Sequence, residues 1–87
     1  MHTLVPKKVA LIVGSFAAFI HVVWSLMVGL GLGQSYLDFV FKMHFLDNPY
    51  TVQNFGLGGA VGLVLIAFIM GNVVGYVFAT IWNRFHR

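Results

Sequence analysis

The chain has 87 residues, of which 60% are hydrophobic and only 8% are charged, and its formal net charge is +3. Soluble domains carry about 25% charged residues, so this composition excludes a protein that covers its surface with water-facing side chains. The length restricts the chain to one small domain. Its basic residues are few and are split between distant segments, which makes nucleic-acid binding a poor interpretation. The chain contains no cysteine, so it has neither disulfides nor thiolate chemistry.

Residues 1–8 form a short tail that we place in the cytoplasm. The next 29 residues, Val9 to Leu37, contain no Lys, Arg, Asp or Glu. A helix needs about 20 apolar residues to cross a bilayer, so this run predicts one membrane span, placed at residues 9–32. A cleaved signal peptide is the alternative, but its apolar region is about 7–15 residues, and here the apolar character continues past Ser25. The alternating glycines from Gly29 to Gly33 predict a flexible helix end.

Residues 34–47 predict a short helix that lies at the external surface of the membrane, in its interfacial region. Asp38 and Lys42 lie four residues apart with the acid first, which favours an ion pair on one helix face. Large apolar side chains surround that narrow polar stripe, as in helices that lie in the plane of a membrane. Residues 48–54 then form a turn that begins at Asn48-Pro49.

The second predicted span covers residues 55–82, capped by Thr51 or Asn54, within a run of 36 residues without Lys, Arg, Asp or Glu. Residues 83–87 form a basic cytoplasmic end. The fold class is therefore an all-α membrane protein with two transmembrane helices in an antiparallel hairpin and an interfacial amphipathic helix between them. Basic and aromatic residues at span ends mark the cytoplasmic side, so both termini are expected there. These interface anchors are Lys7, Lys8, Trp82, Arg84 and Arg87.

Three polar residues fall inside the predicted spans. Counting 1.5 Å per residue from the cytoplasmic ends places His21 about 18 Å deep and Asn72 about 15 Å deep. Ser25 follows His21 by one helical turn. Polar groups without partners in hydrocarbon cost several kcal/mol, so we expect His21 and Asn72 to meet, within the hairpin or across a subunit contact.

Small residues recur at helical spacing on both spans. Ala67, Gly71, Gly75 and Ala79 recur every four residues in the second span, and Asn83, just after it, continues this repeat. Such spacing lets helix backbones approach closely, within one chain or between chains. The predicted packing residues are Gly14, Ala18, Gly29, Gly58, Gly62, Ala67, Gly71, Gly75 and Ala79.

Chemistry beyond packing has little support in the sequence. The four histidines show no metal-ligand spacing, so we expect no metal site. A haem held between His21 residues of two chains is chemically feasible, but a lone histidine on an apolar helix more often serves hydrogen-bonded packing. No nucleophile, base and orienting group occur together, and the chain has no glutamate. We therefore expect neither a cofactor nor enzyme activity.

Residues 36–85 resemble a family of small two-span prokaryotic membrane proteins without known function. The resemblance rests on a Tyr- and Phe-containing connection, the Pro-Tyr-Thr motif at residues 49–51, a glycine-rich start of the second span and "GYVFATIWN" at residues 75–83. It implies a two-span hairpin in the prokaryotic cytoplasmic membrane, and no activity or cofactor. The expected function is a self-associating structural or accessory subunit of a membrane complex. The alternative is an oligomeric pore for ions or small solutes, lined by His21, Ser25 and Asn72.

Overall fold

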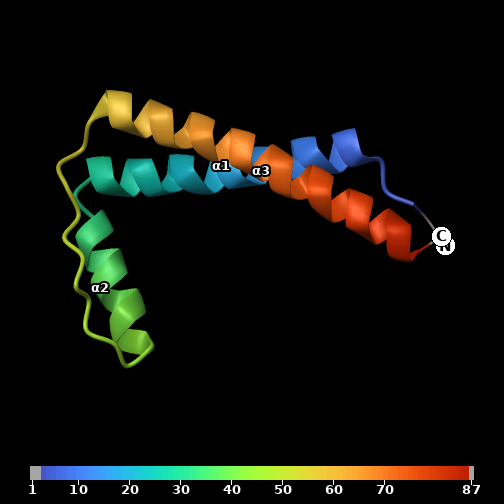
Figure 1. The fold of residues 1–87 in the computed structure, drawn as a ribbon. Helices are drawn as coiled ribbons and strands as arrows, with labels where there is room; N and C mark the ends of the chain where they lie inside the picture. Colours follow the sequence, from blue (N-terminus) through green and yellow to red (C-terminus); the bar gives the residue numbers. More distant parts are fainter. Residues whose placement is uncertain (1–2, 87) are drawn as a thin grey trace.

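The computed structural model describes residues 3–86, which form three helices and, within that range, no strand. Helix α1 spans Pro6–Gly29, α2 spans Gly33–Met43 and α3 spans Leu57–Phe85. The helices α1 and α3 lie side by side, and α2 turns away from them at one end (Figure 1). Residues 44–56, the return segment, connect α2 to α3. The chain measures 47 × 33 × 16 Å along its principal axes.

Both long helices begin without a side-chain cap. Pro6 occupies the first turn of α1, where its fixed φ suits a helix and its missing N–H has no intrahelical acceptor to lose. Gly56 precedes α3 in an extended conformation and makes no side-chain cap bond. The predicted capping by Thr51 or Asn54 is therefore wrong, because α3 starts only after Gly56. Helix α3 also continues past the predicted end at residue 82, to Phe85.

Helix α1 ends in a defined cap instead of a frayed turn. Gly31 has a φ of 79°, its N–H donates to Val28 O at 3.1 Å, and the Leu32 N–H donates to Met27 O at 2.8 Å. These two bonds form a Schellman motif, in which a left-handed residue closes the last carbonyls of a helix. Glycine suits that conformation because it has no Cβ to clash. The chain therefore turns sharply, and α2 begins at Gly33.

The same motif ends α2, but with an aromatic residue in the left-handed position. Phe45 has a φ of 61°, and the Leu46 N–H donates to Phe41 O at 2.9 Å. This conformation costs an L-residue about 1 kcal/mol. The Phe45 side chain is 96% exposed, so packing within the chain does not offset that cost. Helix α2 is therefore shorter than the predicted segment 34–47.

The contact between α1 and α3 consists of small residues, which we call the α1–α3 seam. A Cβ on Gly75 would lie 2.8 Å from Val9 O, and a Cβ on Gly71 would lie 2.7 Å from the Gly14 Cα. The helix backbones thus touch where side chains are absent, which is how helices associate without a hydrophobic drive. The buried seam residues are Ala10 and Gly14 of α1 and Ala67, Gly71, Gly75 and Ala79 of α3.

Contacts along the seam run in opposite chain directions on the two helices. Leu4, before α1, pairs with Asn83 near the end of α3. Gly14 faces Asn72, and Gly29 at the end of α1 faces the Phe55 ring just before α3. The two ends of the described chain therefore lie together, at the end of the molecule opposite α2 (Figure 1).

Candidate functional site

Asn72 lies in the seam, against Gly14. Its Nδ2 donates to Phe68 O at 2.8 Å, one turn back along α3. A Cβ on Gly14 would collide with the Asn72 side chain and lie 2.8 Å from Phe68 O. Gly14 thus provides the space that the amide occupies. Asparagine that bonds the carbonyl of residue i−4 satisfies its own donor without a partner from another helix.

His21 makes a separate bond on α1. Its Nδ1 lies 2.8 Å from Ala17 O, and since a carbonyl only accepts, the ring nitrogen donates. Gly14, which faces Asn72, precedes His21 by seven residues, or about 10 Å along the helix. The predicted bond between His21 and Asn72 within one chain is therefore wrong.

The error comes from the register of the two helices. The depths of His21 and Asn72 were counted from Val9 and Trp82, as if these two residues lay at the same depth in the membrane. The structure instead joins Leu4 to Asn83: the Leu4 N–H donates to Asn83 Oδ1 at 2.6 Å, and Asn83 Nδ2 donates to Leu4 O at 2.7 Å. With this two-bond clamp, Asn72 lies level with Gly14, five residues or about 8 Å from the position that the count gave it. Asn72 thus packs directly against Gly14 in the contact between α1 and α3.

The small residues predicted for packing divide into three groups. Gly14, Ala67, Gly71, Gly75 and Ala79 are buried in the seam. Gly58 and Gly62 differ, because a Cβ on either would meet no atom within 4 Å. Of the remaining two residues, Ala18 is half-buried and Gly29 contacts the Phe55 ring.

Polar side chains hold the return segment against α2. Gln34 bonds two backbone groups of that segment: its Oε1 accepts from the Val52 N–H at 2.6 Å, and its Nε2 donates to Tyr50 O at 3.2 Å. Asp38 Oδ1 accepts from Gln34 Nε2 at 3.0 Å and from Asn48 Nδ2 at 2.7 Å. Asn48 Oδ1 in turn accepts from the Tyr50 N–H. This network leaves residues 48–52 folded back along α2.

The predicted ion pair of Asp38 with Lys42 is replaced by this network. Asp38 accepts its hydrogen bonds from Asn48 and Gln34, and the bond from Asn48, followed by the bond from Gln34, lowers the pKa of the Asp38 carboxyl. Lys42 borders the same surface hollow as Asp38 without donating to it. Sequence spacing missed Gln34 and Asn48, although Gln34 stands one turn before Asp38 on the same helix face.

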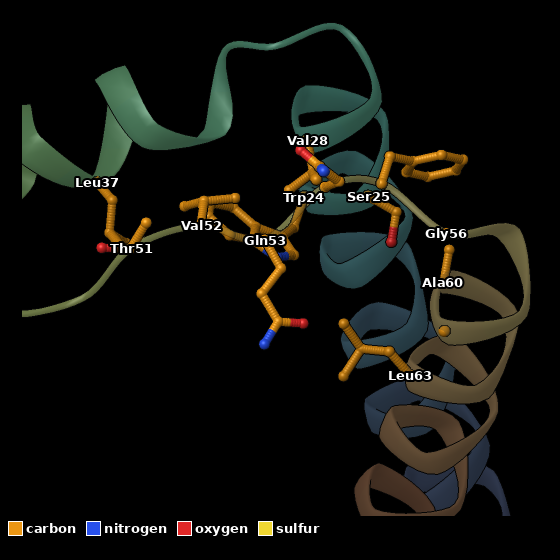
Figure 2. A pocket seen from close by; sticks show the side chains of 13 residues that line it. Trp24, Ser25, Val28, Leu37, Thr51, Val52, Gln53, Gly56, Ala60 and Leu63 are labelled. Atoms are coloured by element: carbon orange, nitrogen blue, oxygen red, sulfur yellow. The ribbon is translucent and has the colours of Figure 1, made fainter.

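A hollow of about 370 Å³ opens between the end of α1, the return segment and the start of α3 (Figure 2). We call it the Trp24 hollow. Ser25 lines it from α1, and the Gln53 side chain extends its amide into the space toward Leu63 of α3. Ser25 was predicted to belong to a midplane polar site, whereas no pattern in the sequence pointed to Trp24 or Gln53. Gly59 of α3 lines the hollow, and a Cβ at this position would meet no atom within 4 Å.

A second hollow of about 330 Å³ lies nearby, and we call it the Leu26 groove. Ser25, Phe55 and Ala60 line both hollows, so the two share a boundary between α1 and α3. Among the described residues that line the groove, Ser25 is the one polar side chain.

The predicted interface anchors among the described residues lie at the end of the molecule where Leu4 joins Asn83. Trp82 stacks on His86 with ring centroids 4.0 Å apart, and Lys7, Lys8 and Arg84 are exposed there. Arg87 lies outside the described residues. Within residues 3–86 the structure has no group of three or more His, Cys, Asp or Glu side chains placed to hold a metal ion.

No family model, curated protein or solved structure matches the chain. The resemblance of residues 36–85 to small two-span membrane proteins therefore stays a prediction. Two of the three helices, α1 and α3, are long and apolar enough to cross a membrane.

Proposed function

We propose that this chain is an integral membrane protein whose helices α1 and α3 cross the bilayer as an antiparallel hairpin, and that it serves as a structural or accessory subunit of a membrane assembly. The role requires no cofactor and no catalytic group. The chain presents its outer surface to lipid and to other membrane helices, including further copies of itself.

The distribution of side-chain sizes on α1 and α3 carries this proposal. The seam contains glycine and alanine, whereas large apolar side chains point outward, such as Ile12 at 68% and Phe16 at 63% exposure. A soluble protein buries such side chains and exposes polar ones. Helices in lipid expose large apolar side chains, because lipid is as apolar as leucine. They place small residues where they contact each other, because these allow close packing.

The accessible surface supports the same reading. It amounts to 6930 Å². A compact soluble monomer of this mass would expose about 5,100 Å². The lengths also fit, since α1 and α3 measure about 36 Å and about 43 Å at 1.5 Å per residue, against a hydrocarbon core of about 30 Å.

The orientation of α2 supports an interfacial position. Its polar residues Gln34 and Asp38 face the return segment. Tyr36, on another face, packs against Trp24 of α1 with ring centroids 6.5 Å apart. The face of α2 that carries Tyr36 is thus turned toward α1. In the proposed arrangement, in which α1 crosses the bilayer, this face is directed toward the membrane. Exposed Phe39 and Met43 add apolar surface to α2.

Charge supports placing both termini in the cytoplasm of a prokaryotic cell. Lys7, Lys8 and Arg84 lie at the end of the molecule where Leu4 joins Asn83. The opposite end carries Asp38 and Asp47 with Lys42. Basic residues near span ends favour the cytoplasmic side.

Extraction and topology measurements test the proposal together. The chain should stay with membranes at alkaline pH, and reporters fused to either terminus should both signal from the cytoplasm. In mild detergent its mass should exceed that of one chain with bound detergent. Release at alkaline pH, or an external signal from one terminus, would contradict the hairpin. A strictly monomeric mass in native membranes and in detergent would contradict the subunit role.

A further inference from the structure

Near α2, the helices α1 and α3 are separated by two hollows that the proposed structural role does not use. Contacts of backbone with backbone occur at Gly14, Gly71 and Gly75. Toward α2, a Cβ on Gly59 would meet no atom within 4 Å, and Gly29 is covered by the Phe55 side chain instead of by the backbone of α3. The Trp24 hollow and the Leu26 groove occupy the resulting gap.

We infer that the Trp24 hollow and the Leu26 groove together bind one uncharged single-chain lipid, with its polar head in the hollow and its chain in the groove. The inference rests on the proposed membrane location of the hairpin. Trp24 lies five residues before the end of α1, about 8 Å along the helix, which places the hollow in the outer leaflet of that arrangement.

The lining of the hollow selects an uncharged head. Within residues 3–86 neither hollow is lined by an Asp, Glu, Lys, Arg or His side chain. A phosphate or ammonium group would therefore enter without a counter-charge, which is costly away from water. Hydroxyl, ester and amide groups instead suit the polar side chains there, which are those of Ser25, Thr51, Gln53 and Asn54.

The hydrogen-bonding capacity of those side chains is available to such a head. The side-chain bonds of the described residues in this region use Gln34, Asp38 and Asn48, and none uses the amide of Gln53 or Asn54. Gln53 directs its amide into the hollow (Figure 2). The neighbouring groove offers Leu26 and Val61 to an apolar chain. Ser25, Phe55 and Ala60 border both hollows, so a ligand that occupies both would lie across these three residues.

The size of the two hollows is typical of sites for small molecules. The hollows measure about 370 Å³ and about 330 Å³. Sites for small molecules typically occupy about 300–1,000 Å³.

The test uses Trp24 as a reporter in a Trp82→Phe background, since the chain has two tryptophans. The protein is reconstituted in phosphatidylcholine vesicles. Tryptophan fluorescence is then titrated with a monoacylglycerol brominated along its chain, and separately with brominated phosphatidylcholine and phosphatidylglycerol. The uncharged probe should quench Trp24 at a mole fraction about tenfold below that of either phospholipid, the size of one favourable hydrogen bond. Its quenching should saturate and should be reversed by unbrominated monoacylglycerol.

Two matched variants locate the site. Gly59→Leu places a side chain in the Trp24 hollow and should abolish the preference. Gly58→Leu adds the same side chain at the neighbouring position, which also has open space but lines neither hollow, and should retain it. Circular dichroism checks that both variants keep their helices. If Gly59→Leu does not fold, the competition with unbrominated probe on the parent decides alone.

The outcomes separate this inference from the proposed function. Equal quenching by all three probes, quenching that does not saturate, or a preference that survives Gly59→Leu would overturn the lipid site and leave the hairpin intact. Absence of quenching by every brominated lipid would place Trp24 outside the bilayer, and the membrane hairpin would fail as well.

Discussion

Asn72 shows how a polar residue is accommodated between two apolar helices. Its amide donates to Phe68 O on its own helix and occupies the space left by Gly14 on the other. His21 likewise donates to Ala17 O on its own helix. Each side chain thus satisfies a donor locally, and neither depends on the other. Asn72 and Gly14 therefore fit together by shape, without a hydrogen bond between them.

We expect the contributions of Asn72 and His21 to stability to be additive. Asn72→Ala and His21→Ala should each cost about 1 kcal/mol or less, because each loses a hydrogen bond to a carbonyl that already accepts from the helix. The double variant should equal the sum within about 0.5 kcal/mol, as for independent sites. A double-mutant cycle on unfolding in detergent measures this. Coupling above about 1 kcal/mol would mean that the two side chains meet, for example across a subunit contact.

At the scale of elements, the return segment depends on side-chain amides. Gln34 bonds the backbone of both Tyr50 and Val52, as a neighbouring strand would. Asn83 does the same for the two backbone groups of Leu4. Extended chain beside a helix has no ladder partner, and these amides supply the missing donors and acceptors.

Gln34→Ala should loosen the return segment without unfolding the helices. The Val52 N–H loses its acceptor, and one hydrogen bond contributes about 1 kcal/mol, so exchange of the Val52 amide hydrogen should accelerate about fivefold. Hydrogen exchange followed by NMR in detergent measures this. Ser35→Ala, at the adjacent exposed position, serves as the control and should leave Val52 exchange unchanged. Equal acceleration in both variants would contradict the specific role of Gln34.

The Asp38 network should also respond to pH. Its hydrogen bonds, first from Asn48 and then from Gln34, lower the pKa of Asp38 in the folded chain. A lowered folded pKa means that the network is stabilised above the ordinary pKa of aspartate and loses that stabilisation as pH falls through the lowered value. An NMR titration of the Asp38 carboxyl should therefore give a midpoint below the ordinary value of aspartate.

Asn48→Ala provides the matched test of that pKa. Without the Asn48 amide, the Asp38 midpoint should rise toward the ordinary aspartate value, and the pH range over which the return segment loosens should rise with it. An unchanged midpoint in this variant would show that Asn48 does not hold the carboxylate.

For the whole molecule, the seam decides how the two long helices fit together. Gly71 and Gly75 contact α1 of the same chain, and a Cβ on Gly75 would lie 2.9 Å from the Ala10 Cα. The stripe therefore has no free face for a second chain. Association with other chains, if it follows the proposed function, must use the outer surface, where Gly58 and Gly62 lie open.

Gly75→Leu should therefore weaken the hairpin itself. The added side chain forces the backbones apart, at a cost of about 1–3 kcal/mol for an overpacked contact. Gly62→Leu, which meets open space, should cost little. Thermal unfolding in detergent compares the two variants, and mass measured alongside should stay unchanged in Gly75→Leu. A changed mass with unchanged stability would mean that the Gly75 stripe serves contacts between chains.

Local features of the chain were sufficient to predict two long apolar helices and the stripe of small residues on α3. A run without charges and a four-residue repeat are properties of neighbouring residues, so both can be recognised without knowing what packs against them. The predicted boundaries deviated by a few residues because caps depend on backbone conformation, as at Gly31 and Phe45.

Only the tertiary structure decided the register of α1 against α3. A stripe that repeats every four residues places small residues opposite small residues again after a shift of one or two turns, so the pattern alone permits several registers. Specific contacts at the two ends select one of them: the clamp of Asn83 on Leu4 and the Phe55 ring on Gly29. The neighbours of Asn72 and the gap that holds the Trp24 hollow both follow from that register, which is why counting along the sequence could not find them.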